Sequence, residues 1–563
     1  MSQDELTRRR FLRGAGAGAA GLAGLAGLAG LRIPMARAAA LPPSAQGLGL
    51  SLQSSADPAL LPTPDQILAQ VEAMVSYGPR LTGSDAQNAW IDQLEAEWSE
   101  AGVSVSRDHF TFTRWLAQSW SLDLLEGASA GAVPISSPFP YTAPTGPQGV
   151  TAPLVYVGPV PLPSIPGNPL DLLSDRWALA QWRQGLATDV KSQLAAVPGG
   201  VKGSIVLLEA PVPPLMAGDF TPFVTYTQDS TEAKAVADAD DDYKRVWVVG
   251  AFIQYVLEAI EEAGPIGAVF ILDASPQNAA GQYTPYAQPL FSIPALYVDR
   301  DTGTTLRAAA KGTPKARLTL VADVAPNTPS DSLVGIMPGD GSTDEVIILN
   351  SHTDGQNAFE ENGGIALTAM ARYFAALGPK ARRRTLVFSA FTGHFGPGLP
   401  QAQGFVDDHP DLIKRAAASV TVEHFGATEW LDNARGYYPT GLPEVGSAWH
   451  SQTPIAVPLV ESMRANSFDR CSALRPIGDY MIAVGGPFHK AGVPTISYIA
   501  GPNYLVDLAP NNHLDKLDTN RFAMELRWFA DITQRLDKLP KAVLQAGDSD
   551  VWAHDGDSLT AIP

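Results

Sequence analysis

Three runs of continuous apolar residues in the second half of the chain constrain the fold most strongly. They occupy residues 346–349, 385–391 and 420–422, and a stretch with helical character at residues 364–377 separates the first two. Strands that are apolar on both faces are typical of mostly parallel sheets covered by helices on either side. The sequence therefore predicts an α/β fold with a doubly wound mixed sheet, in which ligands bind where strands end.

The composition limits the partners and the metal chemistry. The chain has 563 residues, more than the roughly 100 to 200 of one domain. Its net charge of -19 repels phosphate backbones, so nucleic acid is not expected as a partner. Its one cysteine, Cys471, excludes an intramolecular disulfide and a thiolate zinc cluster. Any metal must therefore bind to histidine and carboxylate side chains.

The N-terminus has the features of an export signal. Residues 7–13 resemble a twin-arginine motif, a glycine-rich and mildly apolar stretch follows at 14–31, and Ala36-Arg37-Ala38 fits a signal peptidase site. A transmembrane anchor is the alternative, but the stretch is only weakly apolar. We expect residues 1–38 to be removed as a signal peptide, giving a secreted or periplasmic protein with no membrane association after cleavage.

The change from helical periodicity to short β-rich runs predicts an insertion between two parts of a larger domain. Residues 39–64 form a linker, residues 65–102 have the periodicity of two helices around a turn at 78–84, and residues 103–112 alternate like a strand. Short β-rich runs then dominate, with strands expected at 154–158, 202–208, 264–271, 293–298 and 316–321 and a helix at 303–310. We expect a small β-rich domain at 145–324, a larger domain at 65–144 and 325–540, and a tail at 541–563.

Ionisable side chains follow the apolar runs. His352 and Asp354 come after the first run, and alternate residues of an extended chain point to the same side. A histidine that binds a metal needs its second ring nitrogen fixed, often by a carboxylate. A solvated loop pair would give the same pattern, so His-x-Asp alone does not identify a metal site.

Further acidic residues and histidines precede the expected helix or follow the other apolar runs. Glu360 and Glu361 precede a helix, where acids are favoured by the helix dipole or could aim at the same site as His352. Glu423 and His424 follow the third run. If that segment is extended, His424 points away from Glu423, and we expect it to be packed. The last of these residues is His513.

Taken in order, these motifs resemble the secreted zinc aminopeptidase superfamily, which includes glutaminyl cyclases and the enzymatically silent transferrin receptor ectodomain. The match spans most of residues 65–535 and includes Gly78-Pro79-Arg80-Leu81-Thr82-Gly83-Ser84. Its late elements are Pro-Phe-x-x-Ala-Gly-Val-Pro at 487–494 and His-x-x-x-x-Asp at 513–518. The region 145–324 resembles a protease-associated domain. The resemblance implies a sheet of about eight strands with this insert over its C-terminal strand edge.

The resemblance also implies roles for single residues. His352 and Glu423 match ligands of a first zinc ion, Glu360 or its neighbour Glu361 matches a carboxylate that bridges two ions, and His513 matches a ligand of the second. Asp354 matches the acid that orients the first histidine. One or two zinc ions are therefore expected.

One motif departs from the family. Where relatives have two glutamates, a general base and a ligand of the second metal, this chain has His394 and Phe395. Phenylalanine cannot bind zinc, whereas histidine can accept a proton near neutral pH, so His394 is the expected catalytic residue or an additional ligand.

Three functions remain open from the sequence. The first is an exported metallohydrolase that cleaves a peptide or small amide substrate with metal-activated water. The second is a catalytically silent protein that binds peptides or another partner through the same cleft. The third keeps the fold but acts on a lactone, ester or cyclising substrate.

Overall fold

The computed structural model describes residues 53–165, 167–212, 215–228, 243–284, 290–433 and 435–546. The predicted signal peptide, most of the linker and the end of the predicted tail lie outside these ranges. Among the helices in the described ranges, none combines the length and the hydropathy needed to cross a bilayer.

The predicted mixed α/β fold is confirmed. The principal part of the sheet runs in the order β9, β11, β10, β12, β17, β15, β16, β6, with β11, β10, β12 and β17 parallel to one another. Strands β9, β15 and β6 run antiparallel to their neighbours β11, β17 and β16. The bounds of these strands are β9 (Lys315–Met337), β10 (Val346–His352), β11 (Thr385–Phe391), β12 (Ala416–Val422), β15 (Gly446–His450), β16 (Cys471–Leu474), β17 (Thr495–Ala500) and β6 (Val224–Gln228).

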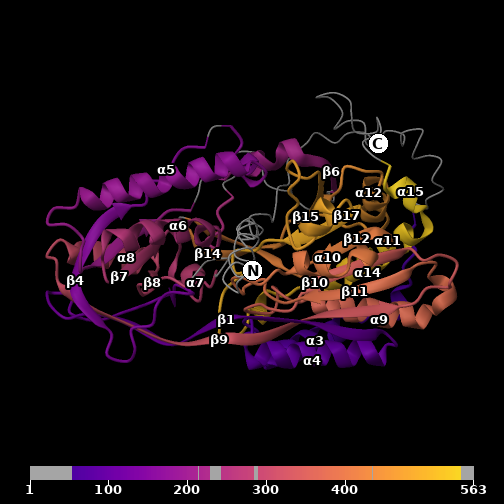
Figure 1. Cartoon of the computed structure of the whole chain (residues 1–563), viewed down its shortest axis with the longest axis horizontal. Coiled ribbons are helices and arrows are strands. Elements are labelled where there is room, and N and C mark those ends of the chain that lie inside the picture. Colours follow the sequence, from indigo (N-terminus) through magenta and orange to yellow (C-terminus); the bar gives the residue numbers. More distant parts are fainter. Residues whose placement is uncertain are drawn as a thin grey trace, which may run out of the picture.

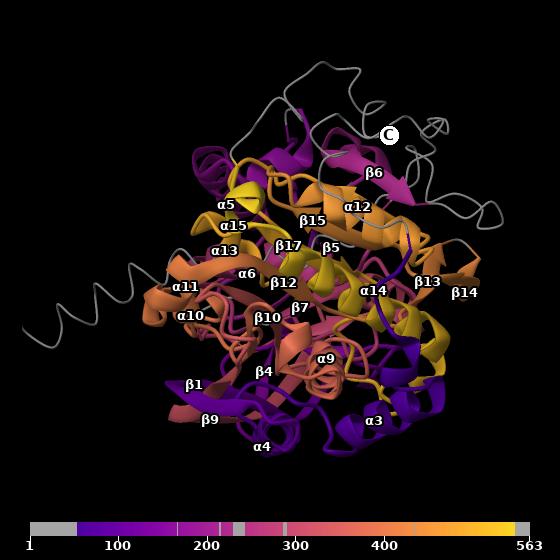
Figure 2. The same cartoon turned by 90° about the vertical axis from the view of Figure 1, so that its right-hand side faces the viewer.

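Helices cover both faces of this sheet, as expected for a doubly wound fold. Along β10 the side chains alternate: Ile347 and Leu349 belong to one core, Val346 and Ile348 to another. Figure 2 shows α4 lying against β9, with α9 beside it. The helices of this larger domain are α3 (Pro64–Ser76), α4 (Asp85–Glu100), α9 (Gly363–Leu377), α10 (Ala402–Asp408), α11 (Pro410–Arg415), α12 (Ala456–Ala465), α13 (Gly486–Lys490), α14 (Thr519–Lys538) and α15 (Lys541–Leu544).

The sheet extends beyond the eight strands expected, because two strands are very long. Strand β1 (Ser104–Leu124) pairs with β9 along almost its whole length, with two bulges, and the far end of β9 pairs with β4. Figure 1 shows this ribbon running along one side of the molecule, between a lobe that contains β10 to β12 and a lobe that contains β4, β7 and β8. The described residues therefore form one sheet of fifteen strands.

The second lobe contains most of the region predicted as an insert. Strands β4, β5, β7 and β8 are parallel neighbours, and β3 closes the edge. Strand β6, although within residues 145–324, instead pairs with β16 at the far edge of the principal sheet. The bounds are β2 (Gly131–Val133), β3 (Ser137–Pro138), β4 (Val150–Pro159), α5 (Arg176–Ala195), β5 (Ile205–Ala210), α6 (Val248–Ala263), β7 (Gly267–Leu272), α7 (Pro276–Ala279), β8 (Ala295–Val298) and α8 (Arg300–Ala310). A separate hairpin consists of β13 (Thr428–Asn433) and β14 (Gly436–Pro443).

Candidate metal centre

Five ionisable side chains meet where three parallel strands end. His352 is the last residue of β10, His394 follows β11, and Glu423 follows β12. Because neighbouring parallel strands end at the same edge of a sheet, these positions are adjacent in space. Together with Glu360, which precedes α9, and His424 they form what we call the His352 cluster. The most exposed of the five, His394, is 6% exposed.

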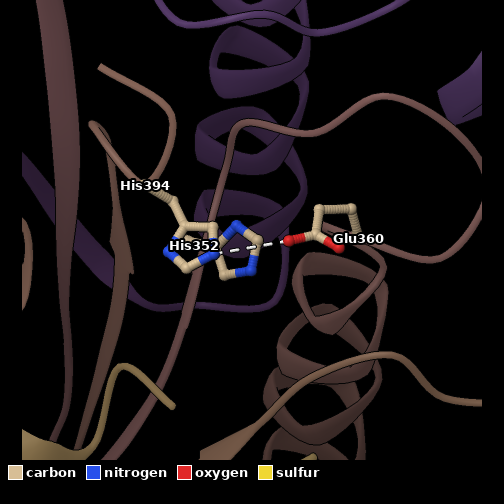
Figure 3. Close-up of side chains that lie close together, drawn as sticks. All are labelled: His352, Glu360 and His394. Atoms are coloured by element: carbon tan, nitrogen blue, oxygen red, sulfur yellow. Dashed lines mark ion pairs between the residues drawn. The ribbon is translucent and has the colours of Figure 1, made fainter. Parts of the chain in front are cut away.

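The distances in the His352 cluster are those of potential metal ligands. Glu360 lies between two imidazoles: its Oε1 is 3.3 Å from Nε2 of His394, and its Oε2 is 3.3 Å from Nε2 of His424. The rings of His352 and His394 stack with centroids 4.3 Å apart. Figure 3 shows these two rings facing the carboxylate of Glu360. Two overlapping sets have all their ligand atoms within 4.8 Å of one another: His352 with Glu360 and His394, and His352 with Glu423 and His424.

Backbone groups fix the orientation of these side chains. The carbonyl of Asp354 accepts from Nδ1 of His352 at 3.0 Å, and the carbonyl of Ala500 accepts from Nδ1 of His424 at 2.6 Å. A carbonyl can only accept, so each Nδ1 carries a proton and Nε2 is the ring nitrogen left to bind a metal. On Glu423, Oε1 accepts from the backbone N–H of Val484 at 2.9 Å.

The polar atoms of the His352 cluster that lack a hydrogen bond show whether these residues could bind a metal ion. Nε2 of His352, Nε2 of His424, both oxygens of Glu360 and Oε2 of Glu423 are buried without a well-aligned hydrogen bond in the described part of the chain. Buried lone pairs of imidazole and carboxylate are the donor set that zinc and similar divalent ions take. The residues present therefore fit a divalent cation.

Glu360 is aimed at the cluster because its neighbours are held elsewhere. Asn362 donates to the carbonyl of Phe425 and accepts from the N–H of Phe425, which ties the start of α9 to the loop after β12. Glu361 forms a fully buried ion pair with Arg80. Burial raises the pKa of Glu361 to about 7, although Arg80 opposes the shift. The structure thus separates two acids that the sequence left as alternatives: Glu360 lies in the His352 cluster and Glu361 does not.

Asp354 orients the cluster differently from the expectation. Its carbonyl, not its carboxylate, meets His352. The carboxylate accepts from the hydroxyl of Thr82 at 2.5 Å and from the backbone N–H of Phe395 at 2.8 Å. It therefore holds the turn that carries His394. Gly393 makes that turn with a φ of 93°, and a Cβ there would lie 2.4 Å from Leu399.

The charges in the His352 cluster are strongly coupled. Burial would raise the pKa of Glu360, but His424 and His394 outweigh it and lower the pKa to about 2. Burial lowers the pKa values of His394 and His424, but the contact with Glu360 outweighs it and raises both. The pKa of His352 falls well below its usual value because it is buried beside His394.

His513 lies outside both sets of potential ligands. Its Nε2 is 3.3 Å from Oδ2 of Asp507, and its ring packs against Tyr504 with centroids 5.2 Å apart. The ammonium of Lys516 lies 5.3 Å from the centre of the same Tyr504 ring. We call Asp507, His513, Lys516 and Tyr504 the Asp507 cluster. The role of His513 as a metal ligand stays a prediction.

Sequence reasoning missed His424 and the loop 78–84 as parts of the site. The expectation that His424 points away from Glu423 assumed an extended segment, but its φ is 61°, in the left-handed region. This turn brings its ring back towards Glu360. Arg80 and Thr82 act on neighbours of the ligands, on Glu361 and Asp354. The adjacency of Glu423 and His424 was the available signal for the first residue.

Comparisons with known proteins support the fold. No family model matches the sequence, and no curated protein matches it. Solved structures do match: a peptidase M28 precursor from Shewanella amazonensis is 16% identical with a TM-score of 0.56, and the alignment covers 88% of this chain and 96% of that one. The zinc aminopeptidase BSAP from Bacillus subtilis is 14% identical with a TM-score of 0.53, covering 84% and 95%. An aminopeptidase from Aneurinibacillus sp. strain AM-1 is 16% identical with a TM-score of 0.50, covering 84% and 92%. At these identities the comparison establishes the fold: an aminopeptidase-like α/β architecture that carries a buried His/Glu cluster.

Proposed function

We propose that the protein is a metal-dependent hydrolase that cleaves a peptide or amide bond near a free amino terminus. The observation that supports this most is that His352, Glu360 and Glu423 bring buried polar atoms without a well-aligned hydrogen bond to the strand ends of an aminopeptidase-like fold. Zinc is the proposed ion, because the Bacillus subtilis protein of this fold is a zinc aminopeptidase.

In this proposal each side chain has one task. A divalent ion held by His352, Glu360 and Glu423 would polarise a substrate carbonyl and make a water molecule more acidic. His394, 3.3 Å from Glu360, would accept a proton from the water and later give it to the leaving amine. Glu360 and the turn held by Asp354 keep the imidazole of His394 in place.

The burial of the site favours a small substrate or a chain end over an internal peptide bond. His352, Glu360 and Glu423 are each 0% exposed. A segment from the second lobe lies against the neighbouring loops: Tyr283 N–H donates to the carbonyl of Val506 at 3.1 Å, and Gln356 donates to the carbonyl of Tyr283. We propose that residues 145–324 are a protease-associated insert that limits access to the site in this way.

The proposal is tested with matched pairs of aminoacyl 4-nitroanilides, one with a free and one with an acetylated amino group. We expect the free member of each pair to be hydrolysed, the activity to disappear after chelation, and zinc to restore it. Hydrolysis of the acetylated members at equal rates would contradict the requirement for a free amino terminus.

A catalytically silent peptide-binding protein is the second candidate. It is favoured by Phe395, whose ring lies beside His394 with centroids 4.7 Å apart and is 1% exposed. An apolar ring there offers neither a proton acceptor nor a ligand. Tight binding of a free-amino peptide, with no turnover of amides, esters or lactones under any divalent ion, would establish this candidate instead.

For the location, we propose export through the twin-arginine pathway with cleavage near Ala39. N-terminal sequencing of exported protein tests this directly. A mature protein that still contains Arg8 would contradict it.

A further inference from the structure

His424 has the geometry of a metal ligand that the sequence pattern did not assign. It is 1% exposed, and its Nδ1–H donates to the carbonyl of Ala500 at 2.6 Å. Its Nε2 lone pair therefore faces the carboxylates, 3.3 Å from Oε2 of Glu360 and 3.9 Å from Oε2 of Glu423. An imidazole whose second nitrogen is fixed by a carbonyl, with a free lone pair among acids, is the usual arrangement of a ligating histidine.

His352 repeats this arrangement on the other side of the carboxylates. Its Nδ1–H is also bound by a backbone carbonyl, that of Asp354, and its Nε2 has no hydrogen-bond partner in the described ranges. A ring nitrogen of His352 lies within 4.8 Å of ligand atoms of both Glu423 and His424. Two imidazole lone pairs and two carboxylates thus meet in a buried space, where burial of unpaired charge is strongly unfavourable.

The chain itself supplies no permanent cation to this space. Among the described residues, no lysine or arginine forms an ion pair with Glu360 or Glu423, and the nearby guanidinium of Arg80 is paired with Glu361. His513, in contrast, has a buried carboxylate of its own in Asp507. His513 also lies outside both sets of ligand atoms that come within 4.8 Å of one another.

We propose that the protein binds one divalent ion through four side chains, His352, His424, Glu360 and Glu423, and has no second ion at His513. This inference rests on the proposed metal-dependent function. With His424 the ion would have four protein ligands, so an ion that also binds substrate would have to reach five-coordination. His394 remains outside the set, against the other oxygen of Glu360.

The test is a metal titration of the full chain after chelation, with His424→Gln and His513→Gln as a matched pair. Glutamine keeps the size and polarity of both side chains but removes the imidazole. We expect one zinc equivalent in the unaltered protein, an affinity at least about 10- to 100-fold weaker in His424→Gln, and one equivalent with little change in affinity in His513→Gln. Two equivalents in the unaltered protein, with one lost in His513→Gln, would overturn the inference.

Cobalt substitution adds a readout that does not depend on turnover or on the stability of a variant. The visible bands of bound Co²⁺ should change in His424→Gln and stay the same in His513→Gln; the reverse would overturn the assignment. If His424→Gln does not fold, the stoichiometry of the unaltered protein and of His513→Gln still decides the question. One equivalent without any hydrolysis would contradict the proposed function and leave this inference standing, whereas hydrolysis with two equivalents would do the opposite.

Discussion

The His352 cluster and the Asp507 cluster contain similar side chains but differ in how their charge is balanced. In the Asp507 cluster, Asp507 meets His513 at 3.3 Å and also accepts from the amide of Gln282, and Lys516 supplies a nearby positive charge. In the His352 cluster, two carboxylates face imidazoles whose Nδ1–H groups are already bound to carbonyls. If the proposed single-ion site is right, the supply of internal cations and donors, more than residue type, decides which cluster takes a metal.

Removing the central imidazole of the His352 cluster is expected to have the largest effect. His352→Ala should abolish zinc binding and lower amide hydrolysis by at least about 10³-fold, because both overlapping ligand sets contain His352. Metal content and the rate of 4-nitroanilide release measure the two effects. His450→Ala is a control for loss of a buried histidine away from the cluster. Unchanged metal content in His352→Ala would contradict the proposal that the His352 cluster is the metal site.

Disrupting the ion pair beside the His352 cluster should be the next largest effect. Arg80→Ala leaves Glu361 buried without its cation, which typically costs about 3–5 kcal/mol of unfolding free energy. Urea unfolding monitored by circular dichroism measures the loss. The double variant Arg80→Ala/Glu361→Gln should recover most of it; if it does not, the damage comes from lost packing of Arg80 and not from the unpaired acid.

Substitution of His394 should affect catalysis but not metal binding. His394→Ala should lower kcat by about 10²-fold, equivalent to about 2.7 kcal/mol, and leave one zinc equivalent bound. The pH dependence of kcat should also lose its acidic limb, because the proton acceptor is gone. Loss of zinc in His394→Ala would place this imidazole among the ligands.

Acid titration of the Asp507 cluster should give a gradual effect on stability, spread over about two pH units. Burial raises the pKa of Asp507 to about 6 in spite of His513, from an ordinary value of 3.8. Between about pH 4 and pH 6 the folded chain therefore holds a proton that the unfolded chain has released, and stability falls as the pH rises by an amount on the order of 3 kcal/mol. Thermal unfolding of chelated protein should show this slope, and Asp507→Asn should flatten it. Identical slopes would mean that His513 compensates fully.

Much of the fold could be predicted because buried strands appear in the sequence as continuous apolar runs. The runs that became β10, β11 and β12 located the strand ends, and with them His352 and Glu423. The length of the β1–β9 ribbon could not be predicted, since the alternation at residues 103–112 marks only its beginning. The ribbon depends on pairing between segments some 200 residues apart, and no local pattern encodes that register.

The sequence located the candidate ligands that directly follow a strand, but it misjudged the direction of His424, where the backbone turns. His424 required a left-handed φ that a bulky residue rarely adopts, so alternation along an extended chain gave the wrong direction. The choice between Glu360 and Glu361 depended on Arg80, which lies about 280 residues away and selects Glu361 through a tertiary contact.

Anomalous diffraction at the zinc absorption edge, from crystals of the zinc-loaded protein, tests the central claim most directly. The account predicts a single strong peak surrounded by His352, Glu360, Glu423 and His424. A peak beside His513 and Asp507, or zinc that stays bound in solution but gives no peak at the ends of β10 and β12, would contradict it.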